Sequence, residues 1–448
     1  MSKVIVLVSI PHFREEDLVY LPVLTRLCSR GQKFVLTPTF PCVTCPVQAN
    51  MTTGKLPSEH GIIGNGLYWR DQNRLEMWTG GNDLVESHQI WDVLSCSQNQ
   101  YKSAVFFPLH SKYCEADYVL TPAPIHNPDG SETLWCWTRP DSLYGELRSE
   151  LGDFPLMNWW GPMANAKSAN WSVEAAVRLA RRERPEFFYL YLPHLDYASQ
   201  KNGPESPEMI AALKEYNTLF ERLTGELNEI YGEENLLWLF AGEYTIVPAS
   251  HVSYPNRLLR EAGLLTVCPD PKGGELIDFA NTPAFAACDH QFSHVYLKDR
   301  SPENAAKVAS LFVGKEGFDD VLYGDRLALY GLNHERTGDL VLVSTPNSWQ
   351  AYYYWLDESA APSFAHTVDI HRKPGYDPCE LIFDPAIRGI TTDAAKIKGT
   401  HGAFARDPLQ KTMLLTSAPV GTDVPELEDV DIFDLVIENA FGSNAGWK

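Results

Sequence analysis

Residues 41–65 read PCVTCPVQANMTTGKLPSEHGIIGN, and they decide the fold more than any other stretch of this chain. They place the hydroxyl of Thr44 and the amide of Asn65 at a fixed separation, with a helix expected over 46–54. A hydroxyl is a poor nucleophile near neutral pH unless a base or a metal ion activates it, and charge that builds on the attacked atom needs a preorganised donor. A helix that begins just after the nucleophile adds its positive N-terminal end. We therefore predict that Thr44 is a nucleophile and Asn65 an oxyanion-binding residue; the alternative is a Thr- and Cys-rich turn before a core helix, with Asn65 in an ordinary Asn-Gly turn.

Composition limits the class of protein. The chain has 448 residues, of which 44% are hydrophobic and 21% charged, enough for a large core and a second lobe. Its nine cysteines, an odd number scattered along the chain, indicate reduced thiols and a cytoplasmic location. The N-terminus, MSKVIVLVSI, predicts a buried first strand rather than a signal peptide.

Two kinds of partner are not expected. No apolar run approaches the roughly 18 residues that a membrane-spanning helix needs, so we expect no membrane partner. A formal net charge of -21 repels polyanions, and we therefore expect no nucleic acid partner.

Short runs of Val, Ile, Leu, Phe and Tyr alternate with amphipathic stretches of helix length, which predicts an α/β fold with a mainly parallel central sheet sandwiched by helices. Core strands are predicted at 4–10, 103–107, 187–192, 236–241 and 339–344. Helices are predicted at 16–30, 46–54, 168–183, 207–231 and 255–262.

Two regions interrupt this alternation. Residues 264–338 predict a small α+β cap insertion, which leaves 1–263 and 339–448 as the catalytic core. Residues 108–167 are irregular and rich in tryptophan, including Trp160. These aromatic side chains either line a pocket for an apolar leaving group or hold a loop on the core.

The segment around Thr44 resembles the nucleophile segment of the nucleotide pyrophosphatase/phosphodiesterase branch of the alkaline phosphatase superfamily. In that branch a threonine precedes T-G-x-x-P-x-x-H-G-I and then an asparagine. The residues that match this pattern are Thr53, Gly54, Pro57, His60, Gly61 and Ile62. The resemblance implies an alkaline-phosphatase-like fold and metal-dependent hydrolysis of phosphodiesters or pyrophosphates through a covalent threonine intermediate. It also implies a small phosphate-containing substrate.

The resemblance implies metal ligands at the ends of successive core strands. Two of these positions are retained: Asp196, which is followed by Gly203 and Pro204, and His401 in a Gly-Thr-His-Gly segment. Zinc in proteins is bound by Asp or Glu oxygen, His nitrogen and Cys sulfur, so both residues are candidate ligands.

Three other ligand positions are altered. Pro11 stands where the family has its first Asp, Gln200 stands in place of a His, and Glu243-Tyr244 replaces an Asp-His pair. Proline has no ligand atom in its side chain, and a glutamine amide binds zinc poorly. Glu243 remains a candidate ligand, and the expected cofactor is a divalent metal, zinc, as one or two ions.

Two clusters offer replacement residues. The segment HTVDIHRKPGYDP carries Asp369 and His371, which are candidate metal ligands because both point to the same side of an extended loop. Arg372 and Lys373 beside them are candidate phosphate-binding residues. The alternative is a structural turn in which Asp and His make local hydrogen bonds.

The second cluster lies in the segment CDHQFSHVYL. Asp289 and His290 are candidate substrate-binding residues, whereas His294 alternates with apolar residues and is expected to be a packed histidine. Because several metal positions are altered, two other functions stay open. The protein either acts on another ester, such as a phosphonate or sulfate, or transfers a group, or it is an inactive relative that only binds an anion.

Overall fold

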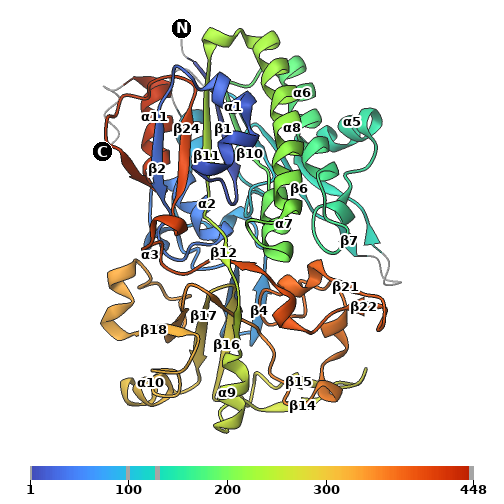
Figure 1. The fold of residues 1–448 in the computed structure, drawn as a ribbon, viewed down its shortest axis with the longest axis vertical. Helices are drawn as coiled ribbons and strands as arrows, with labels where there is room; N and C mark the ends of the chain where they lie inside the picture. The colour runs from blue at the N-terminus through green and yellow to red at the C-terminus, as the bar shows by residue number, and fades with distance from the viewer. Residues whose placement is uncertain (1–2, 97–100, 127–131, 443–448) are drawn as a thin grey trace.

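The apolar run Val4–Ile10 forms strand β1 in the middle of a nine-stranded sheet, and all seven of its residues are buried. This computed structural model describes residues 3–96, 101–126 and 132–442. The sheet has the order β25-β2-β24-β11-β1-β10-β5-β6-β9 (Figure 1). Its strands are β25 (Glu426–Glu428), β2 (Lys33–Thr37), β24 (Thr412–Thr416), β11 (Leu236–Gly242), β1, β10 (Phe187–Tyr191), β5 (Ser103–Phe106), β6 (Tyr118–Pro122) and β9 (Cys136–Arg139).

The sheet is mainly parallel, as predicted. Strand β1 pairs in parallel with both β10 and β11, and β5 continues the parallel set on one side. Antiparallel pairs occur toward the edges, where β24 joins β11 and β2, and where β9 joins β6. Continuous apolar strands such as β1 are typical of a sheet that is covered on both faces.

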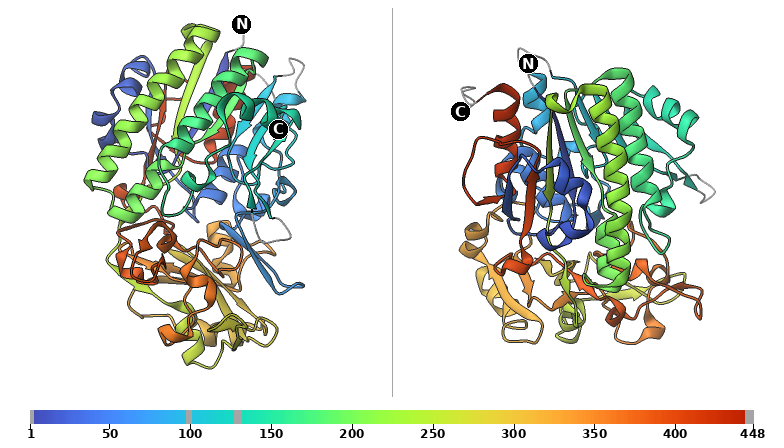
Figure 2. Two further views of the ribbon diagram at one scale, coloured as in Figure 1. Left: turned by 90° about the vertical axis from the view of Figure 1, so that its right-hand side faces the viewer. Right: turned by 45° about the horizontal axis from the view of Figure 1, so that its top comes forward.

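Helices flank this sheet in two groups, visible in Figures 1 and 2. The first group comprises α1 (Pro22–Leu27), α5 (Ser142–Leu151), α6 (Lys167–Glu183), α7 (His194–Asn202) and α8 (Pro207–Tyr231), which contact one another. The second comprises α2 (Thr44–Thr53), α4 (Ile90–Ser95) and α11 (Asp431–Phe441), with the short α3 (Pro57–His60) against α2. Sequence patterns predicted α2, α6 and α8 within one or two residues. The predicted helix at 16–30 is instead a 3₁₀ turn at Glu15–Tyr20 followed by α1, because Pro22 starts a new helix.

A second lobe lies along the long axis of the molecule and has its own hydrophobic core (Figure 1). Its four-stranded sheet has the order β16-β17-β19-β18. The strands of this sheet are β16 (Ala284–Asp289), β17 (Phe292–Leu297), β18 (Phe318–Tyr323) and β19 (Leu340–Ser344). Around it lie α9 (Pro255–Glu261), α10 (Pro302–Ala309), β13 (His251–Ser253), β14 (Val267–Pro269), β15 (Glu275–Ile277), β20 (Ser348–Gln350), β21 (Phe383–Asp384) and β22 (Gly389–Ile390).

The structure corrects one predicted strand. Residues 339–344 were predicted to form a core strand, but they form β19, which lies between β17 and β18 in the second sheet. A buried apolar run has the same pattern in either sheet, since both faces of each are covered.

The chain crosses between the lobes at two adjacent short strands. It leaves the large lobe at β12 (Val247–Pro248) and returns at β23 (Gly399–Thr400), and these two strands pair with each other. We therefore propose 249–398 as the second lobe, in place of the cap predicted at 264–338. The carboxyl ends of β1, β10 and β11 face this lobe (Figure 1).

Two further observations complete the fold. All nine cysteines are free thiols, including the buried Cys42 and Cys45, which stand in C-x-x-C spacing. Within the described residues, no helix is both long enough and apolar enough to cross a membrane.

Candidate active site

Thr44 is the first residue of α2, and it is buried. Its Oγ1 lies 2.9 Å from the hydroxyl oxygen of Tyr244, which follows β11. The first N–H groups of a helix have no hydrogen-bond partner within the helix, so those at the start of α2 beside Thr44 are free to bind groups from elsewhere. One of these groups, the amide of Cys45, donates to Asn65 Oδ1 at 3.0 Å. Thr44 and Asn65 are therefore neighbours in space as well as members of one sequence pattern.

Glu243 directly follows strand β11 and is fully buried. Its Oε1 accepts hydrogen bonds from Ser9 Oγ and from Gln48 Nε2, whereas Oε2 has no partner. Burial raises the pKa of this carboxyl to about 8, although the hydroxyls of Ser9 and Thr44 and the Gln48 amide oppose the rise. A carboxyl that is half ionised near this pH can exchange a proton with a neighbouring hydroxyl.

Asp196 and His401 come from opposite halves of the chain and face each other. Asp196 Oδ1 and His401 Nε2 are 3.8 Å apart, and neither atom has a hydrogen-bond partner. His401 Nδ1 donates to the carbonyl of Cys42, so Nε2 carries the lone pair. Burial lowers the pKa of His401 to about 3 and raises that of Asp196 to about 7. A histidine whose other nitrogen donates to a backbone carbonyl is typical of metal ligation.

The altered ligand positions do not rebuild a two-metal site. The ring of Tyr244 stacks on His401 with the centroids 3.6 Å apart, and Gln200 Oε1 accepts a hydrogen bond from Tyr376. Among the described residues, no three His, Cys, Asp or Glu side chains converge on one point as metal ligands would. Asp196 Oδ1 and His401 Nε2 are two unpartnered donor atoms that face each other, fewer than two zinc ions would need. Glu243 is also predicted as a ligand, and its Oε2 has no hydrogen-bond partner, so that role stays a prediction.

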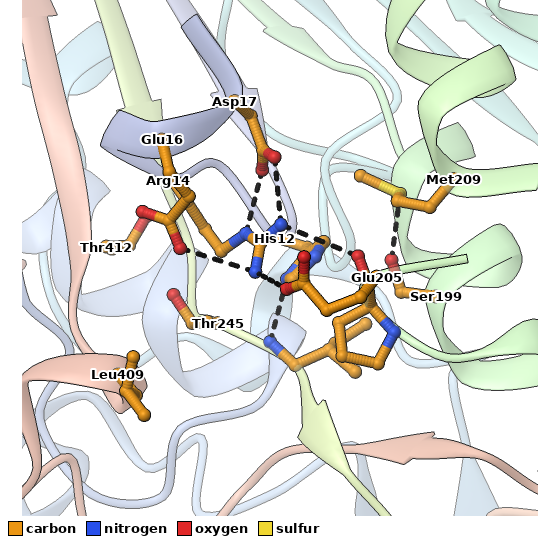
Figure 3. A network of polar contacts seen from close by, with 12 residues as sticks. His12, Arg14, Glu16, Asp17, Ser199, Glu205, Met209, Thr245, Leu409 and Thr412 are labelled. Carbon is orange, nitrogen blue, oxygen red and sulfur yellow. Dashed lines mark hydrogen bonds and ion pairs between the residues drawn. The ribbon is translucent and has the colours of Figure 1, made fainter. Parts of the chain in front are cut away.

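The end of β1, where the first Asp was expected, is filled by a structural network (Figure 3). His12 adopts a positive φ of 55° and accepts the amide hydrogen of Ile246 at Nδ1, so its proton is on Nε2, which therefore cannot bind a metal. Arg14 beside it pairs with Asp17 and Glu205. This network ties the segment after β1 to the loop after α7.

The loop at 366–377 does not bring its predicted residues to Thr44. His371 is exposed, and Asp369 accepts hydrogen bonds from the backbone and side chain of Arg372. Lys373 was predicted at the mouth of the site, but it is 3% exposed and pairs with Asp377 and Glu380 at 2.6 and 2.8 Å. Its charge is therefore already neutralised.

The same loop instead contributes Tyr376, which the sequence analysis missed. The Tyr376 ring stacks on His290 at 3.8 Å, and His290 lies 3.8 Å from the His401 ring, both measured between centroids. Trp160 packs on Tyr376 and donates to Glu380, so the tryptophan-rich region holds this loop in place. A tyrosine near Gly and Pro gives no signal of its own, because only the folded chain brings it to Gln200.

Gln48 was also missed, although a signal for it exists. It stands four residues after Thr44, on the same face of α2, and it joins Glu243 to the amide of Leu109. A buried polar residue one turn from a nucleophile is a candidate partner of the same site.

The tip of the β16–β17 hairpin carries Asp289 and His290 into this site. Asp289 accepts hydrogen bonds from the backbone and side-chain nitrogens of Asn65 at 2.8 and 2.9 Å. His294, further along β17, donates to the carbonyl of Ile63 and accepts from the amide of Gly338. His294 therefore packs structurally, whereas Asp289 contacts the predicted oxyanion-binding residue.

The structure thus gathers a hydroxyl, an amide and a carboxylate–histidine pair beyond the strand ends of a mainly parallel α/β sheet. The pattern of the type I phosphodiesterase / nucleotide pyrophosphatase family matches residues 6–377. The chain belongs to this family, which confirms the resemblance seen at residues 41–65.

Curated relatives match part of the chain. An uncharacterised pyrophosphatase/phosphodiesterase of Schizosaccharomyces pombe is 22% identical over 270 residues, covering 57% of this chain and 46% of that protein. Ectonucleotide pyrophosphatase/phosphodiesterase family member 1 of Mus musculus is 26% identical over 216 residues, covering 47% of this chain and 20% of its own length. The chain thus spans less than half of the curated relatives that it matches.

Solved structures match nearly the whole chain. Phosphonoacetate hydrolase from Sinorhizobium meliloti 1021, in complex with phosphonoformate, superposes with a TM-score of 0.63 at 18% identity, covering 98% of this chain and 96% of that one. The complex with phosphonoacetate gives the same values. At this identity the likeness establishes the shared α/β fold.

Proposed function

We propose that this protein hydrolyses phosphoric diesters or phosphoanhydrides of small molecules, with Thr44 as the nucleophile. The observation that carries the proposal is the burial, in one site, of Thr44, the Asn65 amide and the Asp196–His401 pair. Family membership supports the same class of reaction.

In the first step Thr44 Oγ1 attacks phosphorus and forms a Thr–O–P bond, while the bond from phosphorus to the leaving oxygen breaks. The hydroxyl proton of Thr44 passes to Glu243, whose Oε2 has no other partner. Asn65 donates a hydrogen bond to a nonbridging oxygen and stabilises the charge that develops there. The leaving group departs from the first step as its anion. In the second step water attacks phosphorus and releases one proton to solvent, which balances the charge of that anion, and Glu243 returns its proton to Thr44 as the Thr–O bond to phosphorus breaks.

Asp196 Oδ1 and His401 Nε2 would hold one divalent cation, for which zinc is our candidate. When bound, such an ion polarises a phosphoryl oxygen, and its positive charge balances the negative charge of the buried carboxylates. The same two residues also bring the segment after β10 and the segment after β23 together.

On the free thiols of all nine cysteines we also propose a reducing, cytoplasmic location.

The test is turnover of bis-p-nitrophenyl phosphate by the purified protein, measured together with its metal content. We expect turnover by the wild-type protein, loss of turnover in Thr44→Ala, and about one divalent ion per chain. Turnover that persists in Thr44→Ala would reject the nucleophile. An inactive, anion-binding relative would bind orthophosphate without any turnover that depends on Thr44.

A further inference from the structure

We infer that Asp289, at the tip of the second-lobe hairpin, is a positioning residue for the oxyanion-binding amide of Asn65. This inference rests on the proposed function, since it assigns a role to a residue that acts through Asn65. Asp289 was predicted to contact substrate directly, and the geometry gives it a different task.

The carboxylate of Asp289 holds Asn65 at two points. Oδ2 accepts the backbone N–H of Asn65 at 2.8 Å, and Oδ1 accepts from Asn65 Nδ2 at 2.9 Å. Asn65 is 1% exposed and Asp289 4% exposed, so water does not compete for these bonds. Both partners are therefore fixed relative to each other.

This contact also decides which way the Asn65 amide points. Its Oδ1 faces the N–H of Cys45 at 3.0 Å, while its Nδ2 faces the carboxylate. A flipped amide would place oxygen against carboxylate and N–H against N–H, and both contacts would be repulsive. An amide nitrogen has two hydrogens, and Asp289 takes one of them. The second is the donor that the proposed function assigns to the substrate.

The hairpin tip itself is held firmly against the large lobe. His290 adopts a positive φ of 56°, which is uncommon for a residue other than glycine, and its carbonyl accepts the amide of Gln350 at 2.7 Å. The amide of Gln291 donates to the carbonyl of His401 at 3.0 Å. The tip thus contacts both His401 and Asn65. The position of Asn65 therefore depends, through Asp289, on how the second lobe is placed.

The residue before Asn65 is suited to this approach. A Cβ added to Gly64 would lie 3.3 Å from Asp289 Oδ2, closer than ordinary van der Waals contact. A side chain at this position would therefore displace the carboxylate by a few tenths of an ångström.

The test is a double-mutant cycle between Asp289→Asn and Asn65→Ala, read as kcat and KM for bis-p-nitrophenyl phosphate. Asp289→Asn keeps the shape of the side chain but removes one of its two acceptors. We expect kcat to fall about tenfold to a hundredfold with KM little changed, below the roughly 10² to 10³ expected for losing a donor outright. In the Asn65→Ala background the same change should lower kcat less than twofold, because the group that it positions is gone.

The matched control is Asp429→Asn. Asp429 is equally buried and accepts from Asn50 Nδ2 at 2.8 Å and Thr39 Oγ1 at 2.9 Å, and its bonds do not involve Asn65. Its effect on kcat, whatever its size, should be the same with and without Asn65. Equal effects of Asp289→Asn in both backgrounds, or no effect in either, would overturn the inference.

Two further measurements keep the inference testable if Asp289→Asn does not fold. Gly64→Ala keeps the carboxylate but displaces it, and should lower kcat a few-fold only when Asn65 is present; a wild-type rate would overturn the inference. Binding of orthovanadate to Gly64→Ala, measured by calorimetry, should likewise weaken only when Asn65 is present. A wild-type protein that neither turns over substrate nor binds orthovanadate would reject the proposed function, and the inference with it. A wild-type protein that does both, with additive variants, rejects the inference alone.

Discussion

Thr44 differs from the other threonines of its helix in what its hydroxyl contacts. Thr52 and Thr53 donate to the carbonyls of Gln48 and Ala49, each at 2.7 Å, as threonines inside helices commonly do. Thr44 has no carbonyl one turn earlier to bind, and its hydroxyl faces Tyr244 instead. At the scale of the residue, its position at the helix start leaves this hydroxyl free of a backbone carbonyl, as the proposed nucleophilic role requires.

Substitutions of these threonines should separate catalysis from packing. Thr44→Ala should abolish hydrolysis of bis-p-nitrophenyl phosphate, and Thr44→Ser should keep partial activity because it retains a hydroxyl. Asn65→Ala should lower kcat by about 10² to 10³. Thr53→Ala, which removes a buried hydroxyl of the same helix, serves as the control and should keep the wild-type rate. Equal rates for Thr44→Ala and Thr53→Ala would show that the nucleophile lies elsewhere.

Glu243 should leave a signature in the pH dependence of kcat. Its pKa is raised to about 8 by burial, so the carboxyl is mostly protonated at pH 7 and ionises as the pH rises. Since only the ionised form can accept the proton of Thr44 in the proposed mechanism, kcat should increase through pH 8 and level off above about pH 9. Glu243→Gln should lower kcat and remove this rise. A rise that survives in Glu243→Gln would assign it to another group.

At the scale of the element, sequence patterns identified what local periodicity controls. The runs at 4–10, 187–192 and 236–241 are the central parallel strands, and the long amphipathic stretch at 207–231 is α8. Periodicity does not say which sheet a buried strand joins, and β19 was therefore assigned to the wrong one. Strands β2, β24 and β25, at one side of the sheet, were not predicted, because their position depends on long-range pairing.

The same distinction holds for the site. Thr44 and Asn65 follow from the spacing within one segment, Asp196 and His401 follow from the family resemblance, and the structure brings all four to one place. The hydrogen bonds of Tyr376 to Gln200 and of Asn65 to Asp289 join residues far apart in the chain, and no local pattern encodes such contacts. Charge alone misled at 366–377, where basic and acidic side chains neutralise each other.

This loop should therefore contribute to stability through Lys373 rather than to binding. Lys373→Met would leave Asp377 and Glu380 buried without their cation, which should lower the free energy of unfolding by about 3 to 5 kcal/mol. Arg372→Ala, which breaks the half-exposed pair with Asp369, should change it by about 0 to 1 kcal/mol. Urea unfolding of both variants measures the difference. Similar losses would mean that the Lys373 cluster is not the buried pair that its geometry indicates.

At the scale of the whole molecule, the candidate active site is where two lobes with separate cores meet. The large lobe supplies Thr44, the proposed nucleophile, and the carboxylate–histidine pair, and the second lobe supplies Asp289, His290 and Tyr376. Arg336 strengthens this junction, since its Nη1 donates to the carbonyls of Gly61 and Leu84 beside the nucleophile segment. The site therefore depends on the relative position of the lobes as well as on each lobe's own fold.

The buried carboxyls at this junction predict how stability depends on pH and metal. The pKa values of Asp196 and Asp289 are raised to about 7 and that of Glu243 to about 8, so the folded state binds protons that the unfolded state has already released. Stability from these groups is complete below their ordinary pKa values near 4 and is lost as the pH rises through 7 and 8. Buried histidines such as His401, with a lowered pKa, act in the opposite direction but only below about pH 6.5. Between pH 6.5 and 8 the chelator-treated protein should therefore become less stable.

A divalent ion should reduce that loss of stability, because it favours the ionised form of Asp196 and the neutral form of His401. A ligand that binds only the folded state also stabilises that state by about 2.7 kcal/mol when its concentration is a hundred times its Kd. The measurement is the thermal midpoint from pH 6.5 to 8, with chelator and with added zinc. We expect the midpoint to fall with pH in chelator and to fall less with zinc, and Asp196→Asn should respond little to zinc. His194→Gln is a suitable control, because His194 pairs with Glu215 and stacks on Tyr216 rather than facing Asp196. If zinc raises the midpoints of wild-type protein and Asp196→Asn equally, the ion binds elsewhere, and the carboxylate–histidine pair is not its site.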